Sequence, residues 1–252
     1  MIDPATASAQ WRVATVTAIR DETSEVKTIT FDVPGWPGHL AGQHVDIRLT
    51  AEDGYVAQRS YSIASAAGPG PSIELTVAAV PDGEVSEFLH QELRVGDLIE
   101  LRGPIGGYFA WSADHDYGLL LIAGGSGIVP LMAMLRSRAQ AGANKPARLL
   151  YSSRTADQII YRDELDLLAA RNDGFVLTHT LTRDAPPDWS GERGRIGRVM
   201  LTRRHFLPAD RPDTYVCGPT AFVETVVENL VAMGHLAGRI RTERFGPTGE
   251  FR

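Results

Sequence analysis

Hydrophobic and polar residues alternate over short stretches in the first half of the chain. Stretches rich in β-branched and aromatic residues are separated by Gly, Pro and Asp, and therefore predict strands. They are Trp11–Ile19, Val26–Val33, His44–Leu49, Arg59–Ile63, Ile73–Val80 and Leu98–Arg102. One helix is predicted over Val85–Leu93, because its apolar residues recur at helical spacing. Short strands of this kind are typical of a small antiparallel β-barrel.

The pattern changes after Ser112–Tyr117, a polar stretch that we interpret as a junction between two domains. Continuous apolar stretches then alternate with helical patterns, which predicts a parallel sheet covered by helices on both faces. Strands are predicted at Gly118–Ala123, Ala147–Ser152, Phe175–Leu181 and Thr214–Cys217, and helices through Gln140, over Tyr161–Arg171 and over Thr220–Met233. We therefore expect a β-barrel domain over residues 8–113 and an α/β domain over residues 117–246.

Composition narrows the class of protein. Of 252 residues, 43% are hydrophobic and 22% charged, which is ordinary for a globular protein. No apolar run reaches the roughly 18–20 residues of a membrane helix, and no secretory signal is recognisable, so a cytoplasmic location is expected. Cys217 is the only cysteine, which excludes an internal disulfide and an iron–sulfur cluster with its four ligands. We expect no metal site.

The two halves differ in charge. Residues 1–117 contain 17 Asp and Glu against 7 Lys and Arg, whereas residues 118–252 contain 14 against 18. Lys27 and Lys145 are the only lysines, so the positive charge of the second half is almost entirely arginine, which suits bidentate phosphate contacts. A generic basic surface is the alternative. A net charge of −6 without a basic stripe argues against nucleic-acid binding.

Three short motifs follow one another along the chain. They are Arg59-Ser60-Tyr61-Ser62, Gly124-Gly125-Ser126-Gly127-Ile128-Val129-Pro130 and Cys217-Gly218-Pro219. In this order and at this spacing, the chain resembles the ferredoxin–NADP reductase family over residues 10–246. These flavoproteins pass electrons between a nicotinamide and a one-electron carrier. The resemblance implies an FAD-binding β-barrel followed by an NAD(P)-binding α/β domain.

The first motif carries the expected flavin site. In a strand, Arg59 and Tyr61 point to one side, while Ser60 and Ser62 point to the other. The resemblance implies that Tyr61 stacks on the isoalloxazine ring, Ser62 bonds the atom that accepts hydride, and Arg59 binds phosphate. An ordinary barrel strand with a surface arginine is the alternative for this motif alone. The expected flavin-binding residues are Arg59, Ser60, Tyr61, Ser62, Val77, Gly83, Val85 and Ser86.

Two further turns complete the expected flavin site. At Gly83–Ser86 the free amides of a helix start, with Ser86, are expected to bind pyrophosphate; a plain helix N-cap is the alternative. Gly103–Phe109 resembles the family turn that closes over the flavin. The full length of the barrel segment favours FAD over FMN.

The second motif joins a buried strand to a helix. Its small residues let the backbone approach a pyrophosphate at the helix start. It resembles the Gly-Gly-x-Gly-x-x-Pro of the reductases and is not the Gly-x-Gly-x-x-Gly of dehydrogenases. The nicotinamide-binding residues that we expect here are Gly124, Gly125, Gly127, Ile128 and Pro130.

Polar residues that follow the predicted strands Ala147–Ser152 and Phe175–Leu181 are expected to contact the adenosine ribose. Ser153 and Arg154, with Arg183, are the candidates for a 2′-phosphate, which favours NADPH over NADH. Relatives that use NADH also carry arginine here, so NADH remains open. Arg193, Arg195 and Arg198 form a further run that reaches the cofactor, contacts an acidic partner or is simply solvated.

The third motif lies at a strand end, which in α/β sheets faces the ligand crevice. The resemblance places Cys217 beside the nicotinamide, with Gly218 and Pro219 binding the cofactor; a small apolar core cysteine is the alternative. Glu243 and Phe245 resemble the Glu-x-Tyr ending of plant-type members, where the carboxyl helps proton exchange and the aromatic shields the flavin. Seven residues follow Phe245, which puts the shielding role in question.

The resemblance implies an enzyme that takes hydride from NAD(P)H onto FAD and passes single electrons to a separate carrier. Ferredoxin, flavodoxin or an oxygenase component would serve as the carrier, with the reductase itself a monomer. Ser62, Cys217 and Glu243 are the expected catalytic residues. A free-flavin reductase or oxidase and a non-catalytic nucleotide-sensing subunit are the alternatives.

Overall fold

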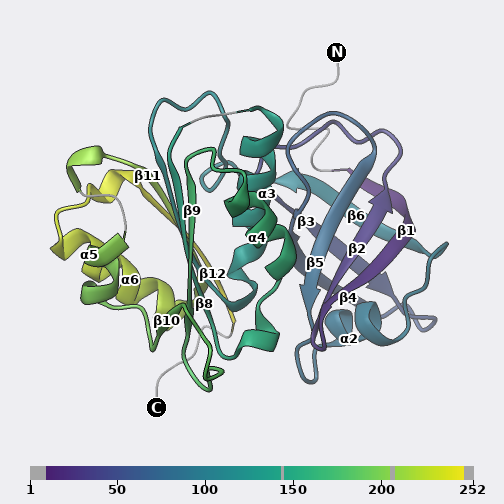
Figure 1. Cartoon of the computed structure of the whole chain (residues 1–252). Helices are drawn as coiled ribbons and strands as arrows, with labels where there is room; N and C mark the ends of the chain where they lie inside the picture. The colour runs from purple at the N-terminus through teal and green to yellow at the C-terminus, as the bar shows by residue number, and fades with distance from the viewer. Residues whose placement is uncertain (1–9, 143–144, 205–207, 247–252) are drawn as a thin grey trace. The chain divides into compact units, whose positions relative to one another are not determined.

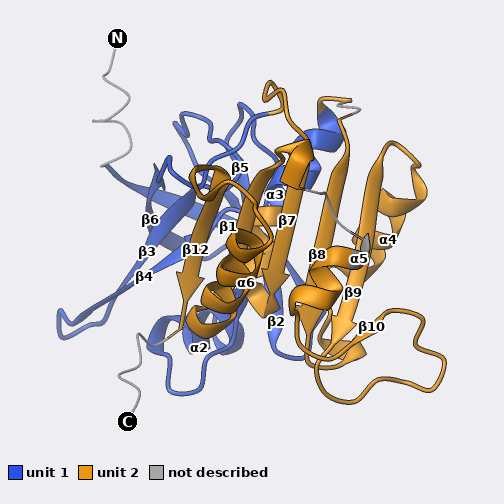
Figure 2. Cartoon of the chain, turned by 90° about the vertical axis from the view of Figure 1, so that its left-hand side faces the viewer, with its two compact units in different colours: residues 1–112, 132–140 blue, residues 113–131, 141–252 orange. Residues whose placement is uncertain are grey.

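The computed structural model describes residues 10–142, 145–204 and 208–246 (Figure 1). The chain divides into two compact units, coloured separately in Figure 2. Unit 1 comprises Met1–Ser112 with Met132–Gln140, and unit 2 comprises Ala113–Leu131 with Ala141–Arg252.

Unit 1 is a six-stranded antiparallel sheet with strand order β4-β3-β6-β1-β2-β5. Its elements are β1 (Trp11–Thr23), β2 (Val26–Asp32), β3 (His44–Thr50), β4 (Val56–Ser62), β5 (Ser72–Ala78), α2 (Glu84–Gln91) and β6 (Leu98–Ile105). The sheet closes on itself just beyond β4, where Ile63 pairs with Leu75 and the amide of Ala64 donates to the carbonyl of Glu74 at 2.7 Å. The unit is therefore the predicted β-barrel.

The barrel core follows from the alternation of side chains. On β3, Val45 and Ile47 are fully buried, while His44 and Arg48 face the other way and are only partly buried. Helix α2 adds Val85 and Leu89 to the same core, which explains the helical spacing of apolar residues in this segment.

Unit 2 is a parallel sheet with strand order β10-β9-β8-β7-β11-β12. Its strands are β7 (Leu119–Gly124), β8 (Ala147–Ser153), β9 (Phe175–Leu181), β10 (Glu192–Arg193), β11 (Asp213–Pro219) and β12 (Ile240–Phe245). Its α-helices are α4 (Arg162–Ala170), α5 (Arg198–Arg204) and α6 (Thr220–Ala232), and α3 (Ile128–Gln140) begins in this unit. Short 3₁₀ turns occur at Gly125–Gly127, Ala156–Gln158, Pro208–Asp210 and Ala237–Arg239.

Helices cover both faces of this sheet. Residues of α5 and α6, including Leu201, Val223 and Leu230, pack with Leu120 and Val216 of the central strands. Figure 1 shows α4 on the opposite side of the sheet. The central strands are buried on both faces, which is why they read as continuous apolar runs.

The predicted fold class is confirmed, and three elements escaped the sequence analysis. Strand β12, the two-residue strand β10 and helix α5 were not predicted, and β4 begins at Val56 rather than Arg59. Both missed strands form sheet edges, and β12 with its sequence Ile-Arg-Thr-Glu-Arg-Phe is mostly half-buried. An edge strand with polar residues lacks the apolar run that identifies a central strand.

Candidate functional site

Strand β4 presents Arg59 and Tyr61 on the core side of the barrel sheet. Their cross-strand partners are Ile47 and Val45, both fully buried. Tyr61 packs against the core, and burial raises the pKa of its phenol to about 12. Arg59 is exposed, and within the described part of the chain its guanidinium donates only to the carbonyl of Gln58, at 2.7 Å. Its charge is thus available to an anion.

Ser60 and Ser62 lie on the other side of β4, and their hydroxyls differ. Ser60 Oγ donates to Asp46 Oδ1 at 2.6 Å, and Arg102 donates to Asp46 Oδ2 at 2.6 Å. Burial alone would raise the pKa of Asp46, but the bonds from Ser60 and Arg102 lower it. Ser62 Oγ has no hydrogen-bond partner among the described residues. The structure therefore separates Ser60, whose hydroxyl is engaged, from Ser62, whose hydroxyl is free.

Gly83 is the N-cap residue of helix α2, and no side chain caps the start of the helix. Ser86 is not its N-cap: the hydroxyl lies within the helix, donates to the carbonyl of Gly83 at 2.9 Å and accepts from the amide of Val80 at 3.2 Å. A β-carbon at Gly83 would lie 2.6 Å from Ser86 Oγ, so this glycine is required by the turn itself. Binding of a phosphate here therefore depends on the backbone amides rather than on the Ser86 hydroxyl.

Val77 and Val85 have buried side chains in the barrel core. The carbonyl of Val77 also interacts with His90 Nε2 at 2.9 Å. The side chains of these two valines therefore support the fold, and only backbone atoms of Val85 remain for a cofactor.

Gln43 was missed by the sequence analysis and connects two of the predicted segments. Its side chain donates to the carbonyl of Gly106 at 2.6 Å, and its own carbonyl accepts from the amide of Ile63 at 2.9 Å. Gln43 thus holds the Gly103–Phe109 turn beside the residue that follows Ser62. A lone glutamine before a strand carries no pattern that would reveal this role.

The residues of unit 1 fit a flavin nucleotide. Arg59 offers an unpaired cation, Ser62 a free hydroxyl and α2 an uncapped helix start, all from described residues. The cation and the helix-start amides can donate hydrogen bonds to phosphates, and the hydroxyl can donate one to a heteroaromatic ring.

The strand order of unit 2 reverses between β7 and β11, and such a switch point is where α/β sheets bind ligands. The turn after β7 packs closely on the end of β11, because a β-carbon at Gly127 would overlap the carbonyl of Cys217. Gly125, in contrast, is exposed, has a φ of +56°, and would place a β-carbon in open space. The turn therefore offers its backbone at Gly125 while Gly127 fixes its position.

Phe222 of α6 was also missed and covers this glycine cluster. A β-carbon at Gly218 would lie 2.6 Å from its ring, and one at Gly124 would lie 3.0 Å from it. Ile128 and Pro130 are buried and anchor the start of α3, while Pro219 is exposed at the end of β11. The motif residues thus form two groups. The buried, tightly packed ones are Gly124, Gly127, Ile128, Pro130 and Gly218, and the exposed ones are Gly125 and Pro219.

The ends of β8 and β9 bring two arginines together. The amide of Arg183 donates to the carbonyl of Arg154 at 2.9 Å, which extends the strand pairing to these residues. Both side chains are exposed, and in the described part of the chain neither has a carboxylate partner. The Oγ of buried Ser153 lacks a hydrogen-bond partner there as well. Adjacent unpaired cations with a free hydroxyl fit a phosphate group.

Cys217 and Glu243 are cross-strand neighbours on β11 and β12. Burial raises the pKa of Glu243 to about 7, and its Oε2 is buried without a hydrogen-bond partner among the described residues. Burial, and secondly the charge of Glu243, raises the pKa of Cys217, so the sulfur stays a thiol. An orphaned buried carboxyl that titrates near neutrality fits a proton-exchanging role.

Phe245 ends β12, where it pairs with Pro219 and is half-buried. Residues 247–252, which include most of the extension after Phe245, lie outside the described residues. Among described residues, no group of three or more His, Cys, Asp or Glu is placed to hold a metal. None of the described helices is long and apolar enough to cross a membrane.

Taken together, the barrel with its cation and hydroxyl and the parallel sheet with its glycine turn define a protein that binds two nucleotide cofactors. Comparison with known families agrees. Residues 13–110 match the oxidoreductase FAD-binding domain, and residues 121–228 match the oxidoreductase NAD-binding domain.

The chain is similar over most of its length to proteins of this kind. It is 35% identical over 229 residues to ferredoxin–NADP reductase B of Sorangium cellulosum, covering 88% of this chain and 91% of that protein. It is 34% identical over 232 residues to the glycine betaine monooxygenase reductase subunit of Pseudomonas aeruginosa (strain UCBPP-PA14), covering 90% of this chain but only 62% of the relative. The flavohem-like FAD/NAD-binding domain of nitric oxide dioxygenase from Vibrio cholerae superposes with a TM-score of 0.83 at 26% identity, covering 94% and 99% of the chains.

The chain belongs to the ferredoxin reductase-like family of FAD- and NAD-binding oxidoreductases. The predicted family and both predicted cofactor classes are thereby confirmed.

Proposed function

We propose that this chain is an NAD(P)H-dependent flavoprotein reductase that passes single electrons to a separate carrier. The observation that carries the proposal is the pair formed by Cys217 and Glu243 on β11 and β12, in which Glu243 Oε2 has no partner among the described residues and lies beside a buried thiol. When bound, FAD takes up an electron pair as hydride from the nicotinamide and releases electrons singly.

Each proposed site residue has a defined task. Arg59 and the amides at the start of α2 bind phosphate, Tyr61 supports the flat ring and Ser62 Oγ donates a hydrogen bond to it. Gly125 exposes its backbone to the nicotinamide cofactor, while Gly218 allows the Phe222 ring to pack closely beside it. Cys217 offers a small apolar neighbour, and the Glu243 carboxyl holds a proton below about pH 7. Phe245 contributes a half-buried aromatic surface.

The arginine pair at Arg154 and Arg183 favours NADPH as the reductant. A 2′-phosphate would bring about two negative charges to two exposed arginines whose backbones are hydrogen-bonded to each other. NADH lacks this group and gains nothing from the pair.

The carrier is proposed to be a ferredoxin, a flavodoxin or an oxygenase component. The relatives named above are a ferredoxin reductase and the reductase subunit of an oxygenase, which supports this range. We further propose a monomeric cytoplasmic protein that binds no nucleic acid, with an FAD-binding domain over residues 8–113 and an NAD(P)-binding domain over residues 117–246.

The test is to purify the full chain, record its visible spectrum and follow bleaching by NADPH and NADH. We expect a yellow protein with about one FAD per chain, bleached faster by NADPH. Cytochrome reduction that requires added ferredoxin separates it from a free-flavin reductase. A colourless protein that binds neither added FAD nor added FMN contradicts the proposal.

A further inference from the structure

Residues 63–67 follow strand β4 directly, and we call them the β4 exit. The amide of Ile63 donates to the carbonyl of Gln43 at 2.9 Å, and the amide of Ala64 donates to the carbonyl of Glu74 on β5 at 2.7 Å. Ile63 and Ala64 are fully buried, so their backbone groups depend on these partners. Barrel strands therefore fix the chain just beyond the end of β4.

The part of α3 that belongs to unit 1 also holds the β4 exit. Arg136 Nη1 donates to the carbonyl of Ala64 at 2.8 Å and to Glu74 Oε2 at 2.8 Å. The next residue, Ser137, accepts from the amide of Ala67 at 2.8 Å. The Arg136 side chain is only 13% exposed, and hydrogen bonds from a charged donor are roughly twice as strong as neutral ones. Arg136 is thus the strongest of these contacts from the helix.

Glu74 meets the β4 exit with three different groups. Its amide donates to Ser65 Oγ at 3.1 Å, its carbonyl accepts from the amide of Ala64, and its carboxylate accepts from Arg136. The N–H of Ala64 is therefore held by the backbone of Glu74, and the C=O by the guanidinium that Glu74 orients. Without Arg136, a buried carbonyl would lose this donor and a carboxylate would lose its cation.

The residue just before the β4 exit is Ser62, whose place depends on this network. Ser62 Oγ has no hydrogen-bond partner among the described residues, so the backbone on either side determines where the hydroxyl lies. A displacement of about 1 Å at a reacting centre can cost a factor of about 100 in rate. The rate of flavin reduction should therefore depend on how firmly Ala64 is held.

We propose that Arg136, oriented by Glu74, is a positioning residue that fixes the place of Ser62 at the reacting flavin ring. It acts through the carbonyl of Ala64 and is not itself a catalytic group. This inference rests on the proposed flavoprotein function and deepens it.

The experiment is to load the full chain with FAD and follow its single-turnover reduction by NADPH in stopped flow, over a range of NADPH concentrations. Arg136→Ala should keep its FAD, while the saturating rate should fall about ten- to 100-fold, as expected for a displaced reacting group. The NADPH concentration that gives half of this rate should stay within about twofold of wild type, because a loss confined to the transition state leaves KM unchanged. Arg136→Lys keeps the charge and should recover part of the rate.

Glu74→Gln is the second variant, for the case that Arg136→Ala does not fold. It keeps the backbone bonds of Glu74 and removes only the charge that faces Arg136. Its saturating rate should fall by less than about tenfold, since the neutral hydrogen bond that remains is roughly half as strong as the charged one.

Arg48→Ala is the matched control. Arg48 forms a two-bond pair with another carboxylate of the barrel, Glu100, at 2.9 and 2.6 Å, and has no hydrogen bond to the β4 exit among the described residues. Its loss should lower the melting temperature and leave the rate of flavin reduction unchanged.

Equal rates for Arg136→Ala and Arg48→Ala, or a loss that Arg136→Lys does not recover, overturn the role of Arg136 while the flavoprotein function stands. If Arg136→Ala does not fold, a wild-type rate in Glu74→Gln overturns it. A wild-type chain that binds no flavin, or whose flavin neither nicotinamide reduces, overturns the proposed function and this inference with it.

Discussion

The two units differ in how many of their buried polar side-chain atoms have a hydrogen-bond partner. In the barrel, buried Asp46 accepts hydrogen bonds from Ser60 and from Arg102, both at 2.6 Å. Among described residues, the buried side-chain polar atoms without a partner include one atom of unit 1, Arg102 Nε. In unit 2 they belong to Ser153, His179, Thr214 and Glu243.

This difference indicates two ways of preparing a binding site. In the barrel, one buried side-chain polar atom of the described residues lacks a partner, and the groups proposed to bind the cofactor lie on β4 and at the start of α2. Buried atoms of Ser153 and Glu243 have no partner within the described part of unit 2, and such groups cost free energy unless a ligand supplies the missing partner. Its glycine turns add backbone that a ligand can approach closely. The following four changes test whether this contrast holds.

The largest effect is expected from Gly127→Ala. The added β-carbon would overlap the Cys217 backbone, which cannot rotate away as a side chain could. We expect a loss of about 3 kcal/mol in unfolding free energy and a melting temperature lower by about 6–12 °C. Gly197→Ala is the control, because a β-carbon there meets nothing within 4 Å. Equal melting temperatures for the two variants, measured by calorimetry, would show that the close packing of Gly127 on Cys217 does not contribute to stability.

The pH dependence of stability should have opposite signs at Glu243 and Asp46. The pKa of Glu243 is raised from 4.5 to about 7, so the folded state binds the extra proton between these values. Its contribution is fully present below pH 4.5 and is lost as the pH rises through about 7, a change on the order of 3 kcal/mol. Asp46 has a lowered pKa, so its contribution is present at neutral pH and is lost as the pH falls.

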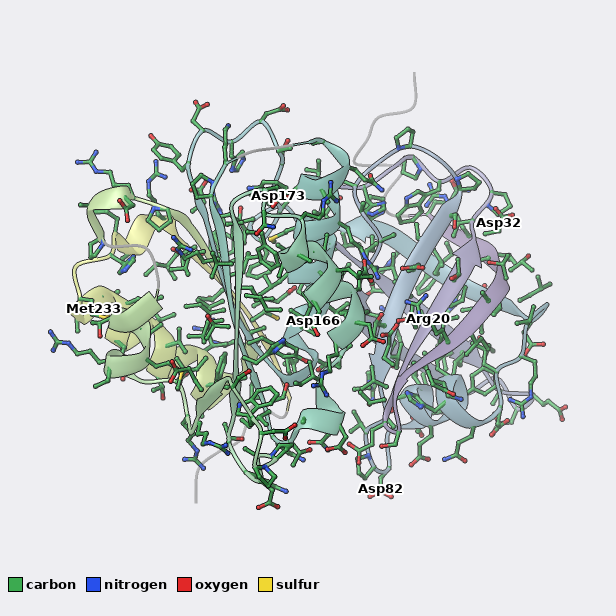
Figure 3. All side chains as sticks on the ribbon, viewed as in Figure 1. Arg20, Asp32, Asp82, Asp166, Asp173 and Met233 are labelled. Atoms are coloured by element: carbon green, nitrogen blue, oxygen red, sulfur yellow. The ribbon has the colours of Figure 1, made fainter. Side chains whose placement is uncertain are left out.

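Denaturant titrations of the flavin-free protein from pH 4 to pH 8 check this prediction. Glu243→Gln should gain stability over wild type towards pH 8, and Asp46→Asn should lose most at neutral pH. The stability of each variant must be compared with that of wild type at every pH, because His179 also contributes to the pH dependence. Burial lowers the pKa of His179 to about 4, so its contribution to stability falls below pH 6.5 while that of Glu243 rises. Asp166 on α4, labelled in Figure 3, counteracts this lowering only in part. Parallel curves for Glu243→Gln and wild type would contradict the assignment.

Arg154→Ala should separate the two nicotinamides. Loss of a charged hydrogen bond to the 2′-phosphate is worth about 1.5–3 kcal/mol, or roughly ten- to hundredfold in kcat/KM for NADPH, with NADH nearly unchanged. Arg183→Ala should have the same sign and a smaller size. Arg171→Ala, at an arginine that instead lies 3.7 Å from Asp173, is the control. Equal losses for both nicotinamides would place Arg154 on the shared part of the cofactor.

The smallest effect is expected from Ser62→Ala. Removing one neutral hydrogen bond costs about 1 kcal/mol, so the single-turnover rate of flavin reduction should fall about fivefold while flavin affinity changes little. Val56→Ala is the control from the same strand, because Val56 is exposed and faces the same side as Ser62: it should leave the rate unchanged. Stopped-flow reduction by NADPH distinguishes the two, and identical rates for Ser62→Ala and wild type would remove Ser62 from the reacting centre.

Much of the fold could be predicted from the sequence, because the local pattern of apolar and polar residues indicates which positions are buried. The alternation along β3, where Val45 and Ile47 are buried, and the apolar run of β7 each reflect a face or a strand that is buried. Strand β12 was not readable, since its half-buried edge position leaves a polar sequence. Of the site, the motif residues could be named, but Gln43 and Phe222 act through contacts that no short motif encodes.

The sequence by itself determined the order of the domains, the alternation of β4 and the glycine turns, because these depend on neighbours within a few residues. Tertiary structure alone decided which polar groups are satisfied. Ser60 and Ser62 are two residues apart and chemically identical, yet only Ser60 meets a carboxylate, which β3 supplies from 14 residues away. Cys217 and Glu243 become neighbours only when β11 and β12 pair. A pKa near neutrality at Glu243 follows from burial, and burial is a property of the packed sheet rather than of the residue.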